Sequence, residues 1–320
     1  MNPHAAPETT VRAEAAATPA ITVRNLVRAY GTVRAVDGLS FTVDAGEIFA
    51  LLGPNGAGKT TTVEILEGYR DRDGGEVTVL GFDPATGGTA YRERIGIVLQ
   101  AAGFEEEFTV RELVRLQVSL YPRRHDPDEL IDLVELTDKR NVRVKALSGG
   151  QRRRLDLALG LAGAPDLLFL DEPTTGFDPA ARRRAWELIE RLRGLGTTIL
   201  LTTHYLEEAQ RLADRVAVLV AGRLVALSSP EGLRSEGRLP TVITFELPAR
   251  AGLAGLPALT GTPEVDGRLV RVRTHTPLVD TWRLTTWAVD AGLELPDLAV
   301  EPPTLEDAYL ALTGEAQDGQ

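Results

Sequence analysis

The stretch that decides the fold is residues 48–60, which read Ile-Phe-Ala-Leu-Leu-Gly-Pro-Asn-Gly-Ala-Gly-Lys-Thr. A short apolar run is followed by a glycine, four further residues, and then Gly-Lys-Thr. Glycines at this spacing let the backbone turn its N–H groups inward, and the helix expected from Thr61 adds favourable potential for anions at its first turn. The lysine adds a point charge and Thr60 adds a hydroxyl suited to Mg²⁺. The stretch therefore predicts a strand, a phosphate-binding loop and a helix.

Three other apolar runs also end at a polar residue that can take part in chemistry. Each run, with the residue after it, is 95–99 with Gln100, 167–170 with Asp171, and 198–203 with His204. From Ile21 onward, short apolar runs alternate with longer amphipathic stretches, which predicts an α/β fold with a largely parallel sheet. Ligands bind beyond the carboxyl ends of strands in such sheets, so we expect the four strand ends to converge on one site.

An acidic pair follows the third of these runs. Asp171 and Glu172 come directly after residues 167–170, and Pro173 prevents a regular strand from continuing. Beside bound phosphates, Asp171 is suited to hold Mg²⁺, and Glu172 is suited to orient and polarise a water for attack on the γ-phosphate.

A second glycine-rich turn lies at residues 147–151, Leu-Ser-Gly-Gly-Gln. Ser148 and Gln151 satisfy the pattern of a capping box, which predicts that a helix begins near Arg152. Capping does not explain two consecutive glycines. They expose the backbone at a helix N-terminus, which predicts a second anion-binding site.

In this order, the motifs resemble those of the nucleotide-binding subunit of ATP-binding cassette (ABC) transporters, over residues 21–230. The resemblance implies a P-loop NTPase core of mostly parallel sheet with antiparallel additions, and it implies ATP and Mg²⁺ as cofactors. The residues implied in nucleotide binding are Tyr30, Gly53, Pro54, Asn55, Gly56, Ala57, Gly58, Lys59, Thr60, Thr61, Gln100, Ser148, Gly149, Gly150, Gln151 and Asp178. Those implied in Mg²⁺ binding are Thr60, Gln100 and Asp171, and those implied in catalysis are Lys59, Glu172 and His204.

The family resemblance also implies individual roles. Tyr30 would stack on adenine, and Gln100 would contact Mg²⁺ and link a helical insertion to the active site. His204 would reach the γ-phosphate and Glu172. Asp178 would lie in the loop through which two subunits communicate. The signature turn at residues 147–151 would close over ATP held by a partner's phosphate loop, so that a head-to-tail homodimer encloses two ATP molecules.

Patterning along the chain suggests three parts, the second of which contains a helical subdomain. Residues 1–20 are rich in Ala, Pro and Thr and are expected to be disordered, without the features of a secretory signal. Residues 21–235 form the predicted nucleotide-binding domain, with a helical subdomain at about 103–160. Residues 239–320 are expected to form a small α+β accessory domain, in which the alternating segments 241–247 and 268–273 resemble exposed strands.

The C-terminal segment 303–314 carries a finer resemblance. It is similar to the ending of ATPase subunits from exporters of the daunorubicin-resistance type. It also fits an amphipathic helix capped by Thr304, with Leu305, Ala308, Tyr309 and Leu312 on one face. The domain before it is expected either to shield this helix or to assist dimerisation.

The amino-acid composition argues against several classes of function. The 320 residues carry 35 basic and 46 acidic side chains, a formal net charge of −11, and no cysteine. Net acidity disfavours a broad nucleic-acid-binding face, and the lack of cysteine excludes thiolate metal sites and disulfides. The longest apolar run, residues 216–221, is too short to span a bilayer.

We therefore expect an ATPase at the cytoplasmic face of the cell membrane, bound through a separate permease that exports a drug-like or lipophilic compound. The alternatives are an importer ATPase, or a soluble ABC ATPase that acts on ribosomes or nucleic acid.

Overall fold

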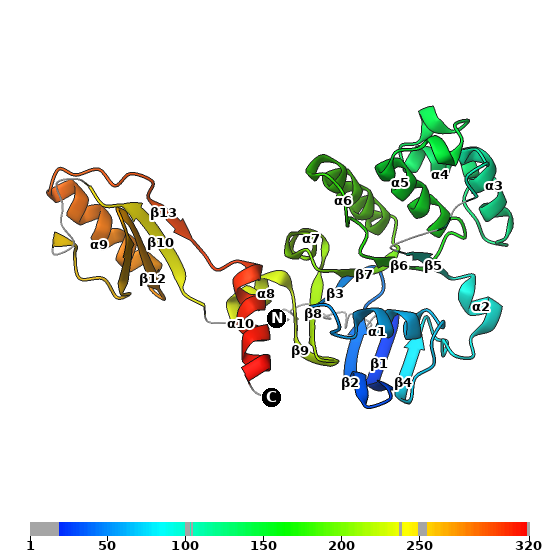
Figure 1. Ribbon diagram of the computed structural model, residues 1–320, viewed down its shortest axis with the longest axis horizontal. Helices are drawn as coiled ribbons and strands as arrows, with labels where there is room; N and C mark the ends of the chain where they lie inside the picture. Colours follow the sequence, from blue (N-terminus) through cyan, green and yellow to red (C-terminus); the bar gives the residue numbers. More distant parts are fainter. Residues whose placement is uncertain (1–18, 100–102, 104, 237–238, 249–254, 319–320) are drawn as a thin grey trace, which may run out of the picture.

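A computed structural model describes residues 19–99, 103, 105–236, 239–248 and 255–318. Most of the predicted disordered tail, and Gln100, lie outside these ranges. Within them the chain forms three sheets, and helices gather around the largest (Figure 1).

The largest sheet has the strand order β5-β6-β7-β3-β8-β9. The first five of these strands run parallel to their neighbours, and the last pairs antiparallel with β8. The strands are β3 (Ile48–Leu52), β5 (Ile95–Val98), β6 (Leu167–Asp171), β7 (Thr198–Thr203), β8 (Arg215–Val220) and β9 (Arg223–Ser228). Every residue of β3 and β7 is buried, as expected for strands covered on both faces. The expectation of a mostly parallel sheet with antiparallel additions is confirmed.

A smaller antiparallel sheet, ordered β2-β1-β4, packs beneath helix α1. Its strands are β1 (Ile21–Tyr30), β2 (Val33–Val43) and β4 (Gly74–Val79); α1 spans Lys59–Leu66, and the short α2 spans Gly88–Arg92. Their apolar side chains join those of the large sheet in one core, in which the Phe41 and Phe49 rings stack with centroids 5.3 Å apart. This core fixes α1 at the end of β3.

The helical part contains α3 (Val110–Ser119), α4 (Pro127–Leu133), two 3₁₀ turns (Thr137–Lys139 and Val144–Ala146) and α5 (Gly149–Gly160). Thr109 and Glu112 form the capping box of α3, and the Asp126 carboxylate caps α4. These helices, with α6 (Pro179–Gly194) and α7 (Leu206–Leu212), share a second apolar core with the large sheet. The helix starts follow the sequence because their caps use neighbouring residues.

Beyond α8 (Pro230–Glu236) lies a third sheet, ordered β11-β12-β10-β13. Its elements are β10 (Thr241–Glu246), β11 (Pro263–Asp266), β12 (Leu269–Thr274), β13 (Ala299–Glu301) and the helix α9 (Pro277–Asp290). The two segments that resemble exposed strands are its central strands. One face of each is fully buried, with Ile243, Phe245, Val270 and Val272 packed against Leu284 of α9. The expected exposure is therefore wrong for that face, because a helix covers it.

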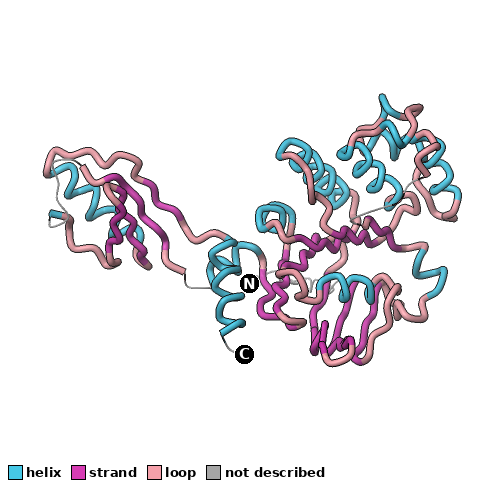
Figure 2. Tube along the Cα trace, viewed as in Figure 1, coloured by secondary structure: helices cyan, strands magenta, loops and turns pink. Residues whose placement is uncertain are grey.

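The last helix, α10 (Leu305–Asp318), packs on the large core and not on the third sheet. Leu305 and Ala308 are about 1% exposed, and Tyr309 and Leu312 pack on the core that contains α7 and β8. The chain thus leaves the core after α8, builds the third sheet and returns as α10 beside α8 (Figure 2). The Thr304 hydroxyl accepts a hydrogen bond from Asp307 N at 3.1 Å, which caps the returning helix as predicted. Among the described helices, none is long and apolar enough to cross a membrane.

Candidate nucleotide-binding site

A cavity of about 510 Å³ opens over the loop between β3 and α1. Its lining contains residues 55–61 together with Asp171 and Glu172, and Val33, Arg34 and Ala35 form part of its wall. The helix α1 begins after Gly58, whose φ is +95°, and no side chain caps this end. A Cβ on Gly58 would lie 2.2 Å from the Ala35 carbonyl oxygen, so only glycine fits there. An uncapped helix N-terminus facing a cavity is suited to bind an anion.

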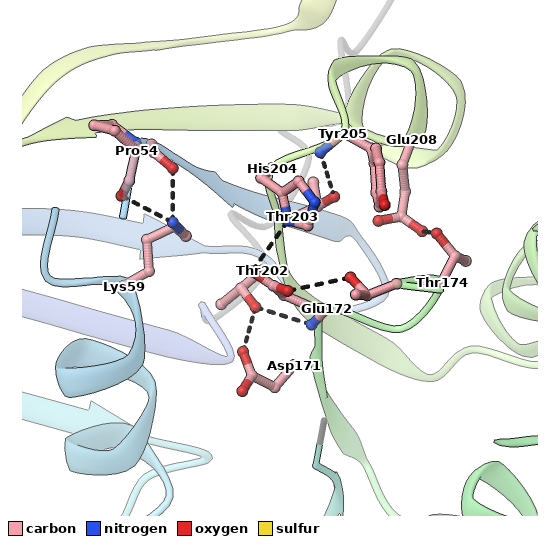
Figure 3. A network of polar contacts seen from close by, with 12 residues as sticks. Pro54, Lys59, Asp171, Glu172, Thr174, Thr202, Thr203, His204, Tyr205 and Glu208 are labelled. Atoms are coloured by element: carbon pink, nitrogen blue, oxygen red, sulfur yellow. Dashed lines mark hydrogen bonds and ion pairs between the residues drawn. The ribbon is translucent and has the colours of Figure 1, made fainter. Parts of the chain in front are cut away.

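Lys59 holds the loop together from inside. Its Nζ donates to the Gly53 carbonyl oxygen at 2.6 Å and to the Pro54 carbonyl oxygen at 3.1 Å (Figure 3). The side chain is 7% exposed, and burial lowers the pKa of its amine, an effect that Glu172 and Asp171 oppose. The loop therefore places one cation next to the cavity.

The acidic pair lies at the end of β6, beside the end of β7. Thr202 Oγ1 donates to Asp171 Oδ1 at 2.5 Å, and the Glu172 amide donates to the Thr202 carbonyl oxygen at 3.1 Å. Glu172 has a φ of +45°, a left-handed conformation that a non-glycine residue rarely adopts. These contacts with the neighbouring strand hold Glu172 in that conformation.

His204 reaches the same carboxylate from the end of β7. Its Nδ1 lies 3.1 Å from Glu172 Oε1 (Figure 3). Thr175 Oγ1 donates to Glu172 Oε2 at 3.1 Å. Three of the four predicted strand ends, those of β3, β6 and β7, therefore meet at one place. The residue predicted for the fourth, Gln100, lies outside the described ranges.

Two features of the cavity fit a triphosphate with Mg²⁺. The N-terminus of α1 is not capped by a side chain, and Thr60 and Asp171 line the same cavity on opposite elements. Hydroxyl and carboxylate oxygens are hard ligands of the kind that Mg²⁺ prefers beside phosphate oxygens.

The second glycine-rich turn differs from the first. Ser148 Oγ accepts from the Gln151 amide at 3.4 Å, and Gln151 Oε1 accepts from the Ser148 amide at 2.9 Å, so the predicted capping box forms. Ser148 and Gly149 are exposed, and neither lines the cavity over the phosphate loop.

Two other predicted residues also lie away from the cavity lining. The ring of Tyr30, 39% exposed, faces the guanidinium groups of Arg28 at 5.1 Å and Arg70 at 5.4 Å. Asp178 is exposed and caps α6, since its Oδ1 accepts from the amides of Ala180 at 2.9 Å and Ala181 at 2.8 Å.

Sequence reasoning missed Arg153, which joins α5 to the strand ends. Its guanidinium donates to the Leu99 carbonyl, to the Asp171 carbonyl at 3.0 Å and to the Pro173 carbonyl at 3.2 Å. It stands between two other arginines in sequence, and no local pattern distinguishes the one that faces inward. Helical periodicity combined with the known position of the sheet could have identified it.

Comparisons with known proteins agree with this geometry. The ABC transporter family profile matches residues 36–175, and a profile described as the C-terminal domain of ABC transporter domain-containing-like proteins matches residues 241–304. The daunorubicin resistance ATP-binding protein DrrA3 of Streptomyces coeruleorubidus is 40% identical over 308 residues, which cover 92% of this chain and 96% of that protein. The chain belongs to the ABC transporter family. It is an ATPase of that family, and it binds ATP.

Two further relatives extend the comparison. The Nod factor export ATP-binding protein I of Rhizobium meliloti is 40% identical over 319 residues, covering 95% of this ABC ATPase and 91% of that protein. A solved ATP-binding subunit of an ABC transporter superposes with a TM-score of 0.62 and 28% identity, covering 68% of this chain and 93% of that structure. The match to the C-terminal profile ends directly before α10.

Proposed function

We propose that this ABC ATPase drives export through a separate membrane-spanning permease, to which it binds at the cytoplasmic face of the membrane. The names of its relatives, which concern daunorubicin resistance and Nod factor export, support export of a drug-like or lipophilic compound. Their similarity covers more than nine-tenths of the chain. The permease is expected to contact the helical subdomain near Gln100.

The proposed reaction is attack of water on the γ-phosphorus of ATP, which breaks the bond from that phosphorus to the β–γ bridging oxygen; ADP leaves with the bond's electron pair, inorganic phosphate is released, and the water's proton passes to Glu172 or to a phosphate oxygen. Glu172 orients and polarises the water, and His204, 3.1 Å from its carboxylate, holds the carboxylate and contacts the γ-phosphate. Lys59 and the N-terminus of α1 stabilise negative charge on the phosphates. Tyr30 stacks on adenine. Thr60, Asp171 and Gln100 would hold Mg²⁺, which supplies positive charge to the phosphate oxygens.

The proposed mechanism rests on one observation about the ATPase itself, which is that its two glycine-rich turns lie apart within one chain. The phosphate loop lines a cavity, whereas Ser148 and Gly149 are exposed outside it. The signature turn, residues 147–151, is therefore free to contact nucleotide that a second copy holds. In the proposed homodimer, Ser148 and Gly150 close over the partner's ATP, and Asp178 lies near the interface between the two copies. The γ-phosphate would favour the closed homodimer, and hydrolysis would release it.

The test is the Glu172→Gln variant, with Glu187→Gln on the exposed face of α6 as a matched control. Loss of the carboxylate is expected to lower steady-state ATP turnover about 100-fold or more. Bound ATP should then trap a dimer that is visible by light scattering, whereas the control turns over like wild type. A hydrolysis-dead variant that stays monomeric at saturating ATP would contradict the homodimer.

The partner class is tested by purification of the tagged chain from detergent-solubilised membranes. Recovery of a multi-span membrane protein supports the proposal. Recovery of ribosomes or DNA in its place would contradict it and favour a soluble ABC ATPase.

A further inference from the structure

A buried polar cluster lies next to the strand ends that carry the acidic pair, and it consists of Glu208, Thr174 and Trp186. Their exposed fractions are 0%, 0% and 3%. Glu208 Oε1 accepts from Thr174 Oγ1 at 2.8 Å (Figure 3) and from Trp186 Nε1 at 3.1 Å. The three residues come from α7, from the loop between β6 and α6, and from α6. We call them the Glu208 cluster.

Thr174 ties the Glu208 cluster to Glu172, which precedes it by two residues. The Thr175 amide donates to the Glu172 carbonyl oxygen at 3.2 Å, and the Thr175 hydroxyl donates to the Glu172 carboxylate at 3.1 Å. Because Thr174 and Thr175 are adjacent, a shift of Thr174 moves the donor that holds the Glu172 side chain. The hydrogen bond from Thr174 to Glu208 therefore bears on where the Glu172 carboxylate lies.

Glu208 belongs to the first turn of the helix that follows His204. Its amide donates to the Tyr205 carbonyl oxygen at 3.1 Å, which fixes it just beyond His204 along the chain. Trp186 extends the cluster to α6. One carboxyl oxygen thus joins three segments, namely the loop after Glu172, the helix after His204, and α6.

The carboxyl group of Glu208 acts through its geometry and not through its charge. Burial raises the pKa of Glu208, but Oε1 accepts both hydrogen bonds whether the group is charged or protonated. Oε2 is buried and has no hydrogen-bond partner among the described residues. Apolar packing would leave the directions of the neighbouring side chains less defined, whereas two hydrogen bonds to one oxygen fix them.

We propose that Glu208 is a positioning residue for ATP hydrolysis. By holding Thr174 against α7, it sets the position of the Glu172 carboxylate relative to the His204 imidazole, whose Nδ1 lies 3.1 Å away. This role rests on the proposed function, in which these two groups act on the attacking water and the γ-phosphate. Glu208 is not part of the described lining of the nucleotide cavity, so its effect reaches the reaction only through Glu172 and His204.

The main test is Thr174→Val, which removes the hydroxyl at nearly constant volume. The kcat for ATP hydrolysis should fall about tenfold because Glu172 loses its fixed position, while KM for ATP stays within about twofold because the phosphate loop is unchanged. Thr174→Ser restores the hydroxyl and should recover kcat to within about threefold of wild type.

Thr274→Val in the third sheet is the matched control. Thr274 is also a buried threonine, and its Oγ1 donates to the buried carboxylate of Asp280 at 2.5 Å. The two valine variants should lose similar amounts of stability in urea unfolding, because each removes a donor from a buried carboxyl group. Only Thr174→Val should lower kcat.

Substitutions of Glu208 separate hydrogen bonding from charge. Glu208→Gln keeps an acceptor oxygen in the place of Oε1 and should retain kcat within about threefold of wild type, whereas Glu208→Ala should lower it about tenfold or more. In a His204→Ala background, Glu208→Ala should lower the residual rate less than about twofold, because the contact that it positions is already lost. A loss in Glu208→Gln as large as in Glu208→Ala would overturn the proposal.

The outcomes distinguish this role from the proposed function. If Glu172→Gln turns over ATP like wild type, the proposed catalytic site fails and the positioning role fails with it. If Glu172→Gln is inactive while Thr174→Val and Glu208→Ala keep the wild-type kcat, the catalytic site stands and the positioning role is refuted. If Thr174→Val and Thr274→Val lose turnover in proportion to their loss of stability, the cluster is only structural, and the proposal is again refuted.

Discussion

The two glycine-rich helix starts of this ABC ATPase are built in opposite ways. The start of α1 has no side-chain cap, and its backbone faces a cavity in which Lys59 is buried. The start of α5 is completed by its own residues, since Ser148 and Gln151 cap each other's amides, and it is exposed. We propose that the first start binds phosphate within one chain, because its backbone N–H groups are left for a ligand. The second start needs no ligand to complete its cap, and we propose that it acts on a nucleotide that another chain holds.

Removal of Lys59 is expected to have the largest effect. Lys59→Ala deletes the cation beside the cavity and leaves the Gly53 and Pro54 carbonyls without their donor. ATP turnover should fall about 100-fold or more, measured as phosphate release at saturating ATP. Lys139→Ala serves as the control because Lys139 lies in a 3₁₀ turn far along the chain from the loop. If Lys59→Ala turned over ATP at nearly the wild-type rate, the phosphate loop at the start of α1 would not be part of the catalytic site.

Replacing one glycine in each glycine-rich turn by alanine tests directly whether the two helix starts differ as described. Gly58→Ala forces a φ of +95° on alanine and places its Cβ 2.2 Å from the Ala35 carbonyl oxygen, so unfolding free energy should fall by about 2–3 kcal/mol. A Cβ on Gly150 would meet no atom of the described residues within 4 Å. It should leave stability unchanged or raise it by up to about 1 kcal/mol, yet lower turnover about tenfold or more. Denaturant unfolding and phosphate release measure the two effects, and equal stability loss in both variants would contradict the contrast.

One buried carboxyl group follows α1 and another lies within α5. Glu67, the residue after α1, is 4% exposed and has no cationic partner among the described residues, whereas Asp156 of α5 lies 3.8 Å from Arg153. Because the folded-state pKa of Glu67 is raised to about 8, its contribution to stability is present below about pH 4.5 and is lost as pH rises through 8. Between pH 5 and 8, the unfolding free energy of the wild type should therefore fall by about 2 kcal/mol relative to that of Glu67→Gln, after allowance for partial access of water to the carboxylate. Parallel pH profiles of the two proteins in urea unfolding would refute the assigned burial.

The smallest effect is expected from the cap of α5. Ser148→Ala removes the acceptor for the Gln151 amide and should lower unfolding free energy by about 1 kcal/mol. Thr109→Ala removes the equivalent cap of α3 and should have a similar effect on stability. Only Ser148→Ala should also weaken ATP-dependent dimerisation, measured by light scattering. If both variants dimerise equally well, the hydroxyl of Ser148 has no role beyond capping.

Much of the site could be predicted because its elements are local. Strand, loop and helix at residues 48–60 follow from spacing, and the capping boxes at Thr109 and Ser148 use residues three positions apart. The ends of β3, β6 and β7 meet because parallel strands bring their carboxyl ends to one edge of the sheet. Sequence reasoning could not find Arg153 or Glu67, because their importance depends on carbonyls and burial supplied by distant segments.

The sequence by itself determined the phosphate loop, the helix starts and the alternating pattern of the third sheet, since each depends on neighbours within a few residues. Only the tertiary structure decided that α10 returns to the large core, that α9 buries one face of β10 and β12, and that the two glycine-rich turns lie apart. The physical reason is that burial and ion pairing are set by which surfaces pack together, and the same amphipathic helix can cover any complementary apolar surface.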